Sequence, residues 1–183
     1  IIMRQVDDIG RMVDEFSAFA RMPQPEMDRY SLLEIVNGQI SLFASKDLSL
    51  DVEIDDAKQD YITICDAGLV RQALTNLLQN AKDSLQEHHV AAPVIRISMT
   101  SEDDMIAITL NDNGPGFPEM DLGKLLEPYV TTRQKGTGLG LAIVSKIMED
   151  HGGNMQLGKA DGGGALVRLK FPIHTTTRNG KII

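Results

Sequence analysis

The spacing of apolar residues at the start of the chain predicts a long amphipathic helix. Apolar side chains recur there at alternating steps of four and three, as in a coiled coil or a helical bundle. They are Ile2, Val6, Ile9, Val13, Phe16 and Ala20. Pro23 and Pro25 end this helix, because proline lacks the N–H for the next helical hydrogen bond. One helix cannot bury such a seam alone, so we expect partner helices in a bundle or dimer; packing against its own domain is the alternative.

The pattern changes after the prolines and predicts a separate folded domain. Residues 23–30 have no clear period, so we interpret them as a linker. Ser31 and Glu34 have the spacing of a capping box, and an amphipathic helix follows them. Apolar and polar residues alternate at 48–54, which predicts a half-buried strand, and residues 61–65 are predicted to be its neighbour in a sheet.

A long helix is predicted from Asp66, a suitable N-cap, to about Glu87. Its apolar stripe consists of Val70, Leu74, Leu77, Leu78, Ala81 and Leu85. At about 100° per residue, Asn76, Asn80 and Asp83 fall together on the opposite face. These side chains could simply be solvated. The alternative is a row of oxygen ligands that faces a polar cavity and suits a hard cation such as Mg²⁺.

The second half of the chain alternates strand-like stretches with one further helix. The expected elements are a hairpin at 94–100 and 105–110, a helical turn at 122–126, a helix from about 141 to 151, and strands at 155–157 and 165–171. His151 precedes two glycines at the end of that helix, and we interpret it as a capping residue, not a catalyst. The mixture of elements indicates an α+β domain.

Two glycine motifs carry candidate chemistry. Asp112 follows an apolar strand and precedes Gly114 and Gly116, so one carboxylate stands beside backbone that a ligand can approach closely. Glycines also alternate from Gly136 to Gly140 just before a helix, which presents free backbone N–H groups to an anion. Either motif alone could be only a tight turn. Together they favour a nucleotide site.

A short polar segment stands directly before the second glycine motif. It contains Thr131, Thr132, Arg133 and Lys135. A segment of this length and composition is suited to be a mobile lid that brings cations to phosphates.

The composition of the chain indicates which classes of partner and which cellular compartment to expect. Of 183 residues, 42% are hydrophobic, which is enough for one sizeable domain. The formal net charge is −8 and no basic stripe is present, which argues against a nucleic-acid partner. We expect neither a membrane span nor a signal peptide, because no apolar run has the required length or flanks. The single cysteine, Cys65, is expected to be a buried thiol in a reducing compartment such as the cytoplasm.

Four blocks resemble, in order and spacing, the nucleotide-binding boxes of histidine kinases. Residues 76–81 resemble the N box, 112–116 the G1 box, 126–129 the F box and 136–141 the G2 box. The set is specific to the Bergerat-type ATPase and kinase superfamily, which also holds gyrase, mismatch-repair and heat-shock chaperone ATPases. The resemblance implies an α/β sandwich with a mixed, mostly antiparallel sheet layered on about three helices. Residues 128–133 are most similar to nitrogen-regulation sensor kinases.

The resemblance also implies a role for each matching residue. Asp112 would accept a hydrogen bond from the adenine amino group, directly or through water, and Asn80 would bind the Mg²⁺ that accompanies ATP. Gly114 and Gly116 would let the chain pass the base, and the backbone at 136–140 would hold phosphate. The full set of implied cofactor-binding residues is Asn76, Asn80, Asp83, Asp112, Gly114, Gly116, Tyr129, Thr131, Thr132, Arg133, Lys135, Gly136, Thr137, Gly138, Leu139 and Gly140.

Three positions depart from the family pattern. Many members carry a basic residue where this chain has Asp83, and the usual phenylalanine of the F box is Tyr129. The last strand opens with residues 164–166, Gly-Ala-Leu in place of Gly-Thr-Thr, so one hydroxyl contact near the adenine is expected to be missing. Arg133 or Lys135 could reach the γ-phosphate.

Residue 76 favours phosphoryl transfer over hydrolysis. Gyrase and chaperone ATPases carry a glutamate four residues before the metal-binding asparagine, where it activates water. Here that residue is Asn76, which cannot take a proton. A histidine on a bundle helix should then be the acceptor, but none of His88, His89, His151 and His174 lies in such a helix. We therefore expect the acceptor histidine outside this chain, which should bind ATP and Mg²⁺ without phosphorylating itself.

The predicted function is the ATP-binding catalytic domain of a two-component sensor histidine kinase. The expected organisation is the end of a dimerisation and phosphotransfer domain at 1–22, a linker at 23–30, the catalytic domain at 31–174 and a tail at 175–183. Expected partners are ATP or ADP, an upstream phosphotransfer helix, a response-regulator receiver domain and a second copy through residues 2–20. The parent protein could be anchored in the inner membrane. A stand-alone ATPase and a degenerate dimerising module are the alternatives.

Overall fold

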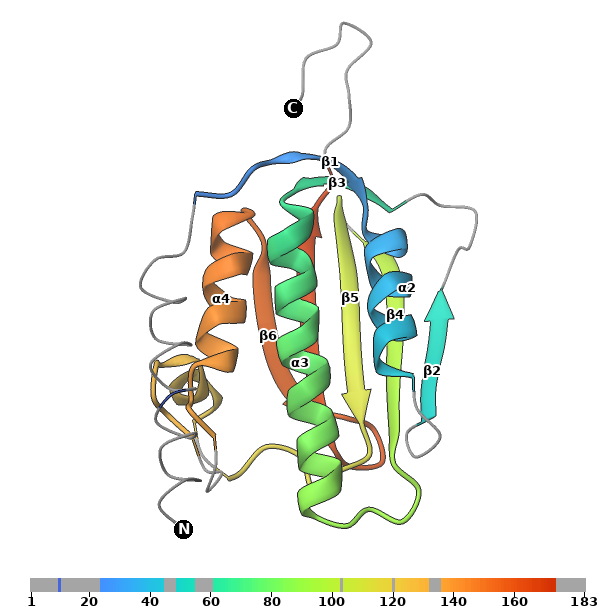
Figure 1. Ribbon diagram of the computed structural model, residues 1–183, viewed down its shortest axis with the longest axis vertical. Helices are drawn as coiled ribbons and strands as arrows, with labels where there is room; N and C mark the ends of the chain where they lie inside the picture. Colours follow the sequence, from blue (N-terminus) through green and yellow to red (C-terminus); the bar gives the residue numbers. More distant parts are fainter. Residues whose placement is uncertain are drawn as a thin grey trace, which may run out of the picture.

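The structure, a computed structural model, describes residue 10 and residues 24–44, 49–54, 61–102, 104–119, 121–131 and 136–173. The six apolar residues of the predicted seam, between positions 2 and 20, and the tail at 175–183 lie outside the described residues. Helices and strands carry the labels of Figure 1.

A five-stranded sheet forms one layer of the domain, in the order β2, β4, β5, β7, β6. The strands are β2 Ser49–Ile54, β4 Val94–Glu102, β5 Met105–Asp112, β6 Asn154–Lys159 and β7 Ala165–Pro172. β2 pairs in parallel with β4, and the other neighbours pair antiparallel. This pairing confirms the mixed, mostly antiparallel sheet and the β4–β5 hairpin expected from the sequence.

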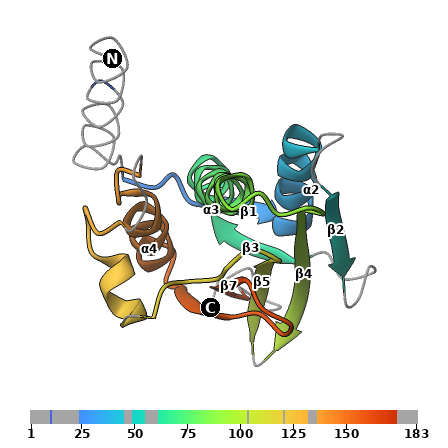
Figure 2. The same cartoon turned by 90° about the horizontal axis from the view of Figure 1, so that it is seen from below.

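Three helices cover one face of this sheet (Figures 1 and 2). They are α2 Leu32–Phe43, α3 Ala67–Glu87 and α4 Gly140–Asp150. α3 lies between the other two and packs against both. Most of its predicted apolar stripe is buried, namely Val70, Leu74, Leu77, Leu78 and Leu85. The predicted α/β sandwich is confirmed, and no helix among the described residues is long and apolar enough to cross a bilayer.

The side-chain alternation of β5 decides where Asp112 points. Ile106, Ile108 and Leu110 are buried in the core between the sheet and the helices. Successive strand residues face opposite sides, so residues two apart share a face. Asp112, two residues beyond Leu110, therefore emerges on the helix side at the end of the strand.

A second, two-stranded sheet crosses the domain at the end where α3 begins (Figure 1). Strand β1 (Asp28–Ser31) pairs antiparallel with β3 (Ile62–Cys65). The prediction that residues 61–65 neighbour residues 48–54 is therefore wrong, because β1 pairs with β3 while β2 pairs with β4. Residues 28–30, expected as linker, belong to β1. We call residues 24–31 the leading segment.

Two helices begin at the caps predicted for them. Ser31 Oγ accepts a hydrogen bond from the N–H of Glu34 at 3.3 Å, at the start of α2. Asp66 Oδ1 accepts from the N–H groups of Gly68 at 2.8 Å and Leu69 at 3.0 Å, at the start of α3. Both side chains satisfy first-turn donors that have no partner inside the helix.

Cys65 is a fully buried free thiol, as predicted. Burial, supported by the negative charge of Asp66, raises its pKa to about 11, although Arg71 opposes the shift. The folded protein therefore keeps the thiol proton between pH 9 and 11, where the unfolded chain releases it. A raised pKa gives stability that is present below the unfolded value and is lost as pH rises through the folded value.

We expect this thiol to lower the free energy of unfolding by about 1 kcal/mol between pH 8 and pH 10. Urea unfolding at the two pH values measures the change, and Cys65→Ala is the control because it removes only this titration. The variant should lose less stability over the same interval than the parent chain. Equal losses would contradict the assignment.

Candidate functional site

The carboxylate of Asp112 is fixed by backbone groups from two directions. Its Oδ1 accepts hydrogen bonds from the N–H of Gly114 at 2.9 Å and the N–H of Ala165 at 3.2 Å. The structure gives Oδ2 no hydrogen-bond partner within the described ranges. The residue is partly buried, on the helix side of the sheet. One oxygen is therefore immobilised and the other is left to accept a hydrogen bond from a ligand.

The glycines after Asp112 fit between α3 and the β6–β7 turn. A Cβ on Gly114 would lie 3.0 Å from Oδ1 of Asp112 and 3.5 Å from Oγ of Ser84 on α3. A Cβ on Gly116 would lie 3.0 Å from the carbonyl oxygen of Gly164 in the turn. The motif is thus a tight turn, and it also holds Asp112 in place.

The polar row on α3 is partly enclosed. Asn76, Asn80 and Asp83 are all partly buried. Nδ2 of Asn76 is buried and has no hydrogen-bond partner in the described structure. A Cβ on Gly140 would lie 3.3 Å from Nδ2 of Asn80, so Asn80 lies beside the start of α4. Oδ1 of Asp83 accepts a hydrogen bond from Gln79 at 2.5 Å. Asn80 thus meets the second glycine motif, while Asp83 is bonded along its own helix.

The second glycine motif leads into α4, as predicted. Gly140 is the first residue of α4, and its N-cap, Leu139, makes no side-chain capping hydrogen bond. The Leu139 side chain is in the core, so only its backbone can face a ligand. Oγ1 of Thr137 accepts from the N–H of Leu139 at 3.4 Å. The first turn of α4 therefore presents N–H groups without a capping side chain, an arrangement suited to an anion.

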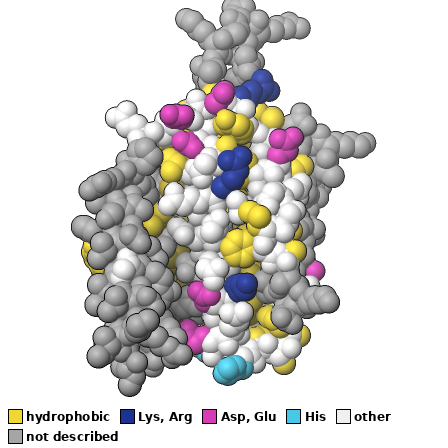
Figure 3. Space-filling model, viewed as in Figure 1, with side chains coloured by type: hydrophobic (Ala, Val, Ile, Leu, Met, Phe, Trp, Pro, Cys, Tyr) yellow, Lys and Arg dark blue, Asp and Glu magenta, His cyan; other side chains and the backbone are white. Residues whose placement is uncertain are grey.

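The charged side chains on the helix side of the molecule are dispersed. Figure 3 shows this face, on which the Lys and Arg side chains of the described residues stand singly among acidic and neutral groups. The chain as a whole is acidic, with a formal net charge of −8. A bound phosphate here would depend on directed backbone donors more than on a general positive field.

Tyr129 meets the second glycine motif through its backbone. Its N–H donates to the carbonyl oxygen of Gly138 at 3.1 Å. A Cβ on Gly138 would lie 2.6 Å from the carbonyl carbon of Tyr129, so only glycine allows this approach. The side chains of Tyr129 and Thr131 are exposed. Residues 132–135, with the predicted lid cations, lie outside the described part of the chain, and their phosphate contacts stay predictions.

The motifs converge on the C-terminal half of α3. Gly140 lies against Asn80, and Gly114 lies against Ser84, one turn further along the same helix. Gly114 is in turn bonded to Asp112. The structure thus brings three of the four sequence blocks to one region of α3, and the Tyr129 backbone connects the fourth block to Gly138.

The side chains present suit a nucleotide-bound Mg²⁺ better than a metal held by protein alone. No group of three or more His, Cys, Asp or Glu that could hold a metal occurs among the described residues. Asn80 offers one amide oxygen beside the start of α4, and the buried Nδ2 of Asn76 needs an acceptor oxygen nearby. Mg²⁺ typically keeps several waters and takes few protein ligands in addition to substrate phosphates.

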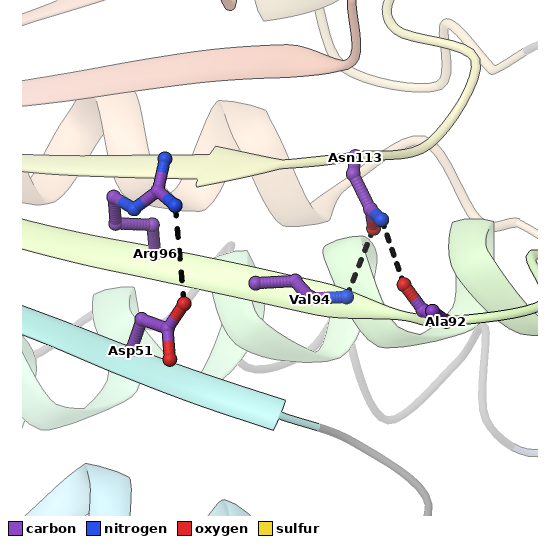
Figure 4. A network of polar contacts seen from close by, with 5 residues as sticks. All are labelled: Asp51, Ala92, Val94, Arg96 and Asn113. Atoms are coloured by element: carbon purple, nitrogen blue, oxygen red, sulfur yellow. Dashed lines mark hydrogen bonds and ion pairs between the residues drawn. The ribbon is translucent and has the colours of Figure 1, made fainter.

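Asn113 has a structural role that could not be predicted from the sequence. Its Oδ1 accepts from the N–H of Val94 at 2.9 Å, and its Nδ2 donates to the carbonyl of Ala92 at 2.7 Å (Figure 4). Its own N–H donates to the carbonyl of Val94 at 3.3 Å. The side chain thereby extends the β4–β5 ladder beyond Asp112, close to the Arg96–Asp51 ion pair of 3.9 Å between β4 and β2. Asparagine one residue after a strand is too common to signal this role.

Replacing Asn113 with alanine is expected to lower the free energy of unfolding by about 1–2 kcal/mol, because two hydrogen bonds are lost at an exposed position. Urea unfolding measures the loss. Asn154→Ala is the matched control, since Asn154 is an exposed asparagine on β6 whose side chain has no hydrogen bond to any residue that the structure describes. Equal stability of the two variants would contradict the role of Asn113.

Comparison with known proteins identifies the family. A family model described as histidine kinase-, DNA gyrase B-, and HSP90-like ATPase matches residues 65–175. Nitrogen regulation protein NtrY of Azorhizobium caulinodans is 46% identical over 178 residues, which cover 92% of this chain and 22% of that protein. An NtrY-like sensor histidine kinase of Rickettsia bellii is 35% identical over 171 residues, which cover 93% and 28%. The chain thus spans about a quarter of the length of these curated relatives.

Solved histidine kinases share the fold. The nucleotide-free catalytic domain of histidine kinase ThkA matches with a TM-score of 0.70 and 29% identity, over 80% of this chain and 95% of that domain. ThkA in complex with the response regulator protein TrrA matches with a TM-score of 0.73 and 22% identity, over 94% and 49%, and shows the fold alone. Since the family model covers more than half of the chain, the chain belongs to the histidine kinase-, DNA gyrase B- and HSP90-like ATPase family, in which it is the ATP-binding catalytic domain of a two-component sensor histidine kinase.

Proposed function

We propose that this domain binds ATP together with Mg²⁺ and transfers the γ-phosphoryl group to a histidine of a phosphotransfer domain, for relay to a response-regulator aspartate. The observation that carries the proposal is the fixed carboxylate of Asp112, with Oδ1 held by two backbone N–H groups and Oδ2 left to a ligand. A carboxylate oxygen accepts a hydrogen bond from the amino group of adenine, and it repels the carbonyl oxygen that guanine has at the same place. Asp112 would therefore select the base.

Each motif has one task in this proposal. Oδ1 of Asn80 would bind Mg²⁺, and the N–H groups at the start of α4 would bind phosphate oxygens. Mg²⁺, when bound, would neutralise part of the phosphate charge. The buried Nδ2 of Asn76 would donate to a phosphate or water oxygen and so gain a partner. The other proposed site residues are Asp83, Gly114, Gly116, Tyr129, Thr131, Thr132, Arg133, Lys135, Gly136, Thr137, Gly138, Gly140 and the backbone of Leu139.

The amide at position 76 supports transfer over hydrolysis. Water must lose a proton as it attacks phosphorus, and an amide cannot accept one. Phosphoryl transfer to an imidazole needs no such base, because the neutral ring nitrogen is itself the nucleophile. The domain would then contribute mostly positioning and charge neutralisation.

We also propose roles for residues outside the described part of the chain, and partners for the domain. Residues 1–22 would be the end of a phosphotransfer helix that dimerises through positions 2–20, and residues 23–27 would be a linker. The catalytic domain would run from residue 28, where β1 begins, to residue 174. ThkA has been solved with a response regulator, and we propose a receiver domain as the partner here. Similarity to NtrY supports a role in nitrogen regulation. The domain would work in the cytoplasm, where ATP is available.

Phosphotransfer between separate chains tests this proposal. The 183-residue chain is mixed with γ-labelled ATP, Mg²⁺ and the histidine-bearing phosphotransfer domain of Azorhizobium caulinodans NtrY. We expect acid-labile label on that domain only when both proteins are present, and none when its acceptor histidine is alanine. Failure of the chain to bind ATP would overturn the proposal. Sustained phosphate release by the chain alone would support the ATPase alternative.

A further inference from the structure

The ends of α3 and α4 that lie far from the nucleotide motifs are joined to each other and to the leading segment. The two helices pack side by side and run in opposite directions, so α3 begins where α4 ends (Figure 1). Asn80 and Gly140 meet at one end of the pair, and Asp66 and His151 meet at the other. Fourteen residues of α3, at 1.5 Å each, separate these two meeting points by roughly 20 Å.

Asp66 binds the leading segment with one carboxylate oxygen and α3 with the other. Oδ2 accepts a hydrogen bond from the N–H of Glu26 at 2.9 Å, while Oδ1 caps α3. Burial would raise the pKa of Asp66, but the N–H groups of Glu26, Leu69 and Gly68 together lower it below its ordinary value. The charged carboxylate is thus the form that the junction stabilises. β1 reinforces the attachment, since Asp28 pairs with the residue directly before Asp66.

His151 connects the same residue to the end of α4. Nε2 lies 2.9 Å from the backbone N–H of Asp66, and Nδ1 lies 2.6 Å from the carbonyl oxygen of Ile147. A carbonyl cannot donate, so Nδ1 carries the hydrogen, and Nε2 must accept. The ring is buried and forms a T-shaped pair with the ring of Phe171, with centroids 6.1 Å apart. The sequence-based interpretation as a cap is confirmed, but His151 also bonds a residue 85 positions away, which gives it a second role.

We propose that Asp66 and His151 are positioning residues that couple the leading segment to the nucleotide site. α3 and α4 pack against each other, so a displacement at one end of the pair would alter the spacing at the other, where Asn80 lies beside the start of α4. The leading segment follows directly after the proposed phosphotransfer helix. A movement of that helix would therefore shift the leading segment and, through its attachment to Asp66, the residues that hold ATP. The inference rests on the proposed function for the nucleotide end of the pair.

Three substitutions separate the contacts of this junction. Asp66→Asn keeps a good helix cap, because asparagine caps as well as aspartate, but turns an NH₂ group toward the N–H of Glu26. His151→Leu removes the acceptor for the Asp66 N–H, whereas His151→Gln places an amide oxygen within its reach. Asp28→Asn is the matched control, since the one hydrogen bond that Asp28 accepts from a described residue comes from the adjacent Arg29 N–H, and asparagine can accept it too.

The readouts are AMPPNP affinity with Mg²⁺ by calorimetry and amide hydrogen exchange of residues 24–31. In the parent 183-residue chain, AMPPNP should slow exchange at the Glu26 amide. Asp66→Asn and His151→Leu should weaken AMPPNP binding by about five- to tenfold and abolish this slowing, because coupling between two sites is reciprocal. His151→Gln and Asp28→Asn should retain parent affinity within about twofold.

Two outcomes would overturn the coupling while leaving the proposed function intact. One is faster Glu26 exchange in Asp66→Asn at unchanged AMPPNP affinity. The other is a His151→Gln variant that binds AMPPNP as weakly as His151→Leu, which would indicate a purely structural role for the ring. If the parent chain does not bind AMPPNP at all, both the proposed function and the coupling fail, and that result precedes any comparison of variants.

Discussion

Replacing Asp112 with asparagine is expected to weaken ATP binding at least about 100-fold while the fold stays intact. The new Oδ1 can still accept from Gly114 and Ala165, so the turn is kept. The other oxygen becomes an NH₂ group, which opposes the adenine amino group donor to donor where a charge-assisted bond had formed. Losing such a bond and leaving its donor unpaired costs roughly 3 kcal/mol, or about 100-fold in Kd. Calorimetry with AMPPNP measures the loss.

The base specificity of the same variant provides a sharper test. Inosine triphosphate carries a carbonyl oxygen where ATP has its amino group, so an asparagine NH₂ at position 112 could donate to it. The preference for ATP over inosine triphosphate should therefore fall or reverse. Asp104→Asn is the matched control, because Asp104 is exposed at the opposite end of the hairpin and its φ of +61° is one that asparagine tolerates. An unchanged base preference in Asp112→Asn would show that Asp112 does not read the base.

The parts of the fold that the sequence predicts correctly are those specified by local periodicity. α3 spans residues 67–87, as predicted, because a strong apolar stripe and the Asp66 cap are both encoded within one stretch. The same period correctly places Asn76 and Asn80 away from the core stripe. The hairpin and the Asp112 turn are also short-range features, since their residues are neighbours in sequence.

The parts of the fold and of the site that could not be predicted from the sequence depend on contacts between distant residues. β1 and β3 have four residues each and lie more than thirty positions apart, so neither carries enough alternation to indicate its partner. The sequence around His151 predicts only its capping role. Its second role is a hydrogen bond to Asp66, which is 85 positions away, so no local pattern indicates it. The contact from Ala165 to Asp112 is made by a backbone N–H, which every residue except proline has. The side chain at that position therefore gives no signal of it.

Gly164 is the residue whose substitution is expected to be most damaging. It has a φ of +88°, and a Cβ there would lie 1.8 Å from the carbonyl oxygen of Asp112. Backbone atoms on both sides of this contact leave no flexible side chain to move aside. Alanine would therefore displace the β6–β7 turn and pull the N–H of Ala165 away from Asp112.

We expect Gly164→Ala to lower the free energy of unfolding by more than about 4 kcal/mol and to abolish AMPPNP binding in whatever remains folded. Gly162→Ala is the matched control in the same turn, because Gly162 also has a φ of +88° but its Cβ would have no atom of the described residues within 4 Å. It should lose only the roughly 1 kcal/mol that an alanine incurs at positive φ. Urea unfolding compares the two variants directly. Similar stabilities would mean that the turn can move without cost, and Asp112 would then owe its orientation to its own loop and not to the β6–β7 turn.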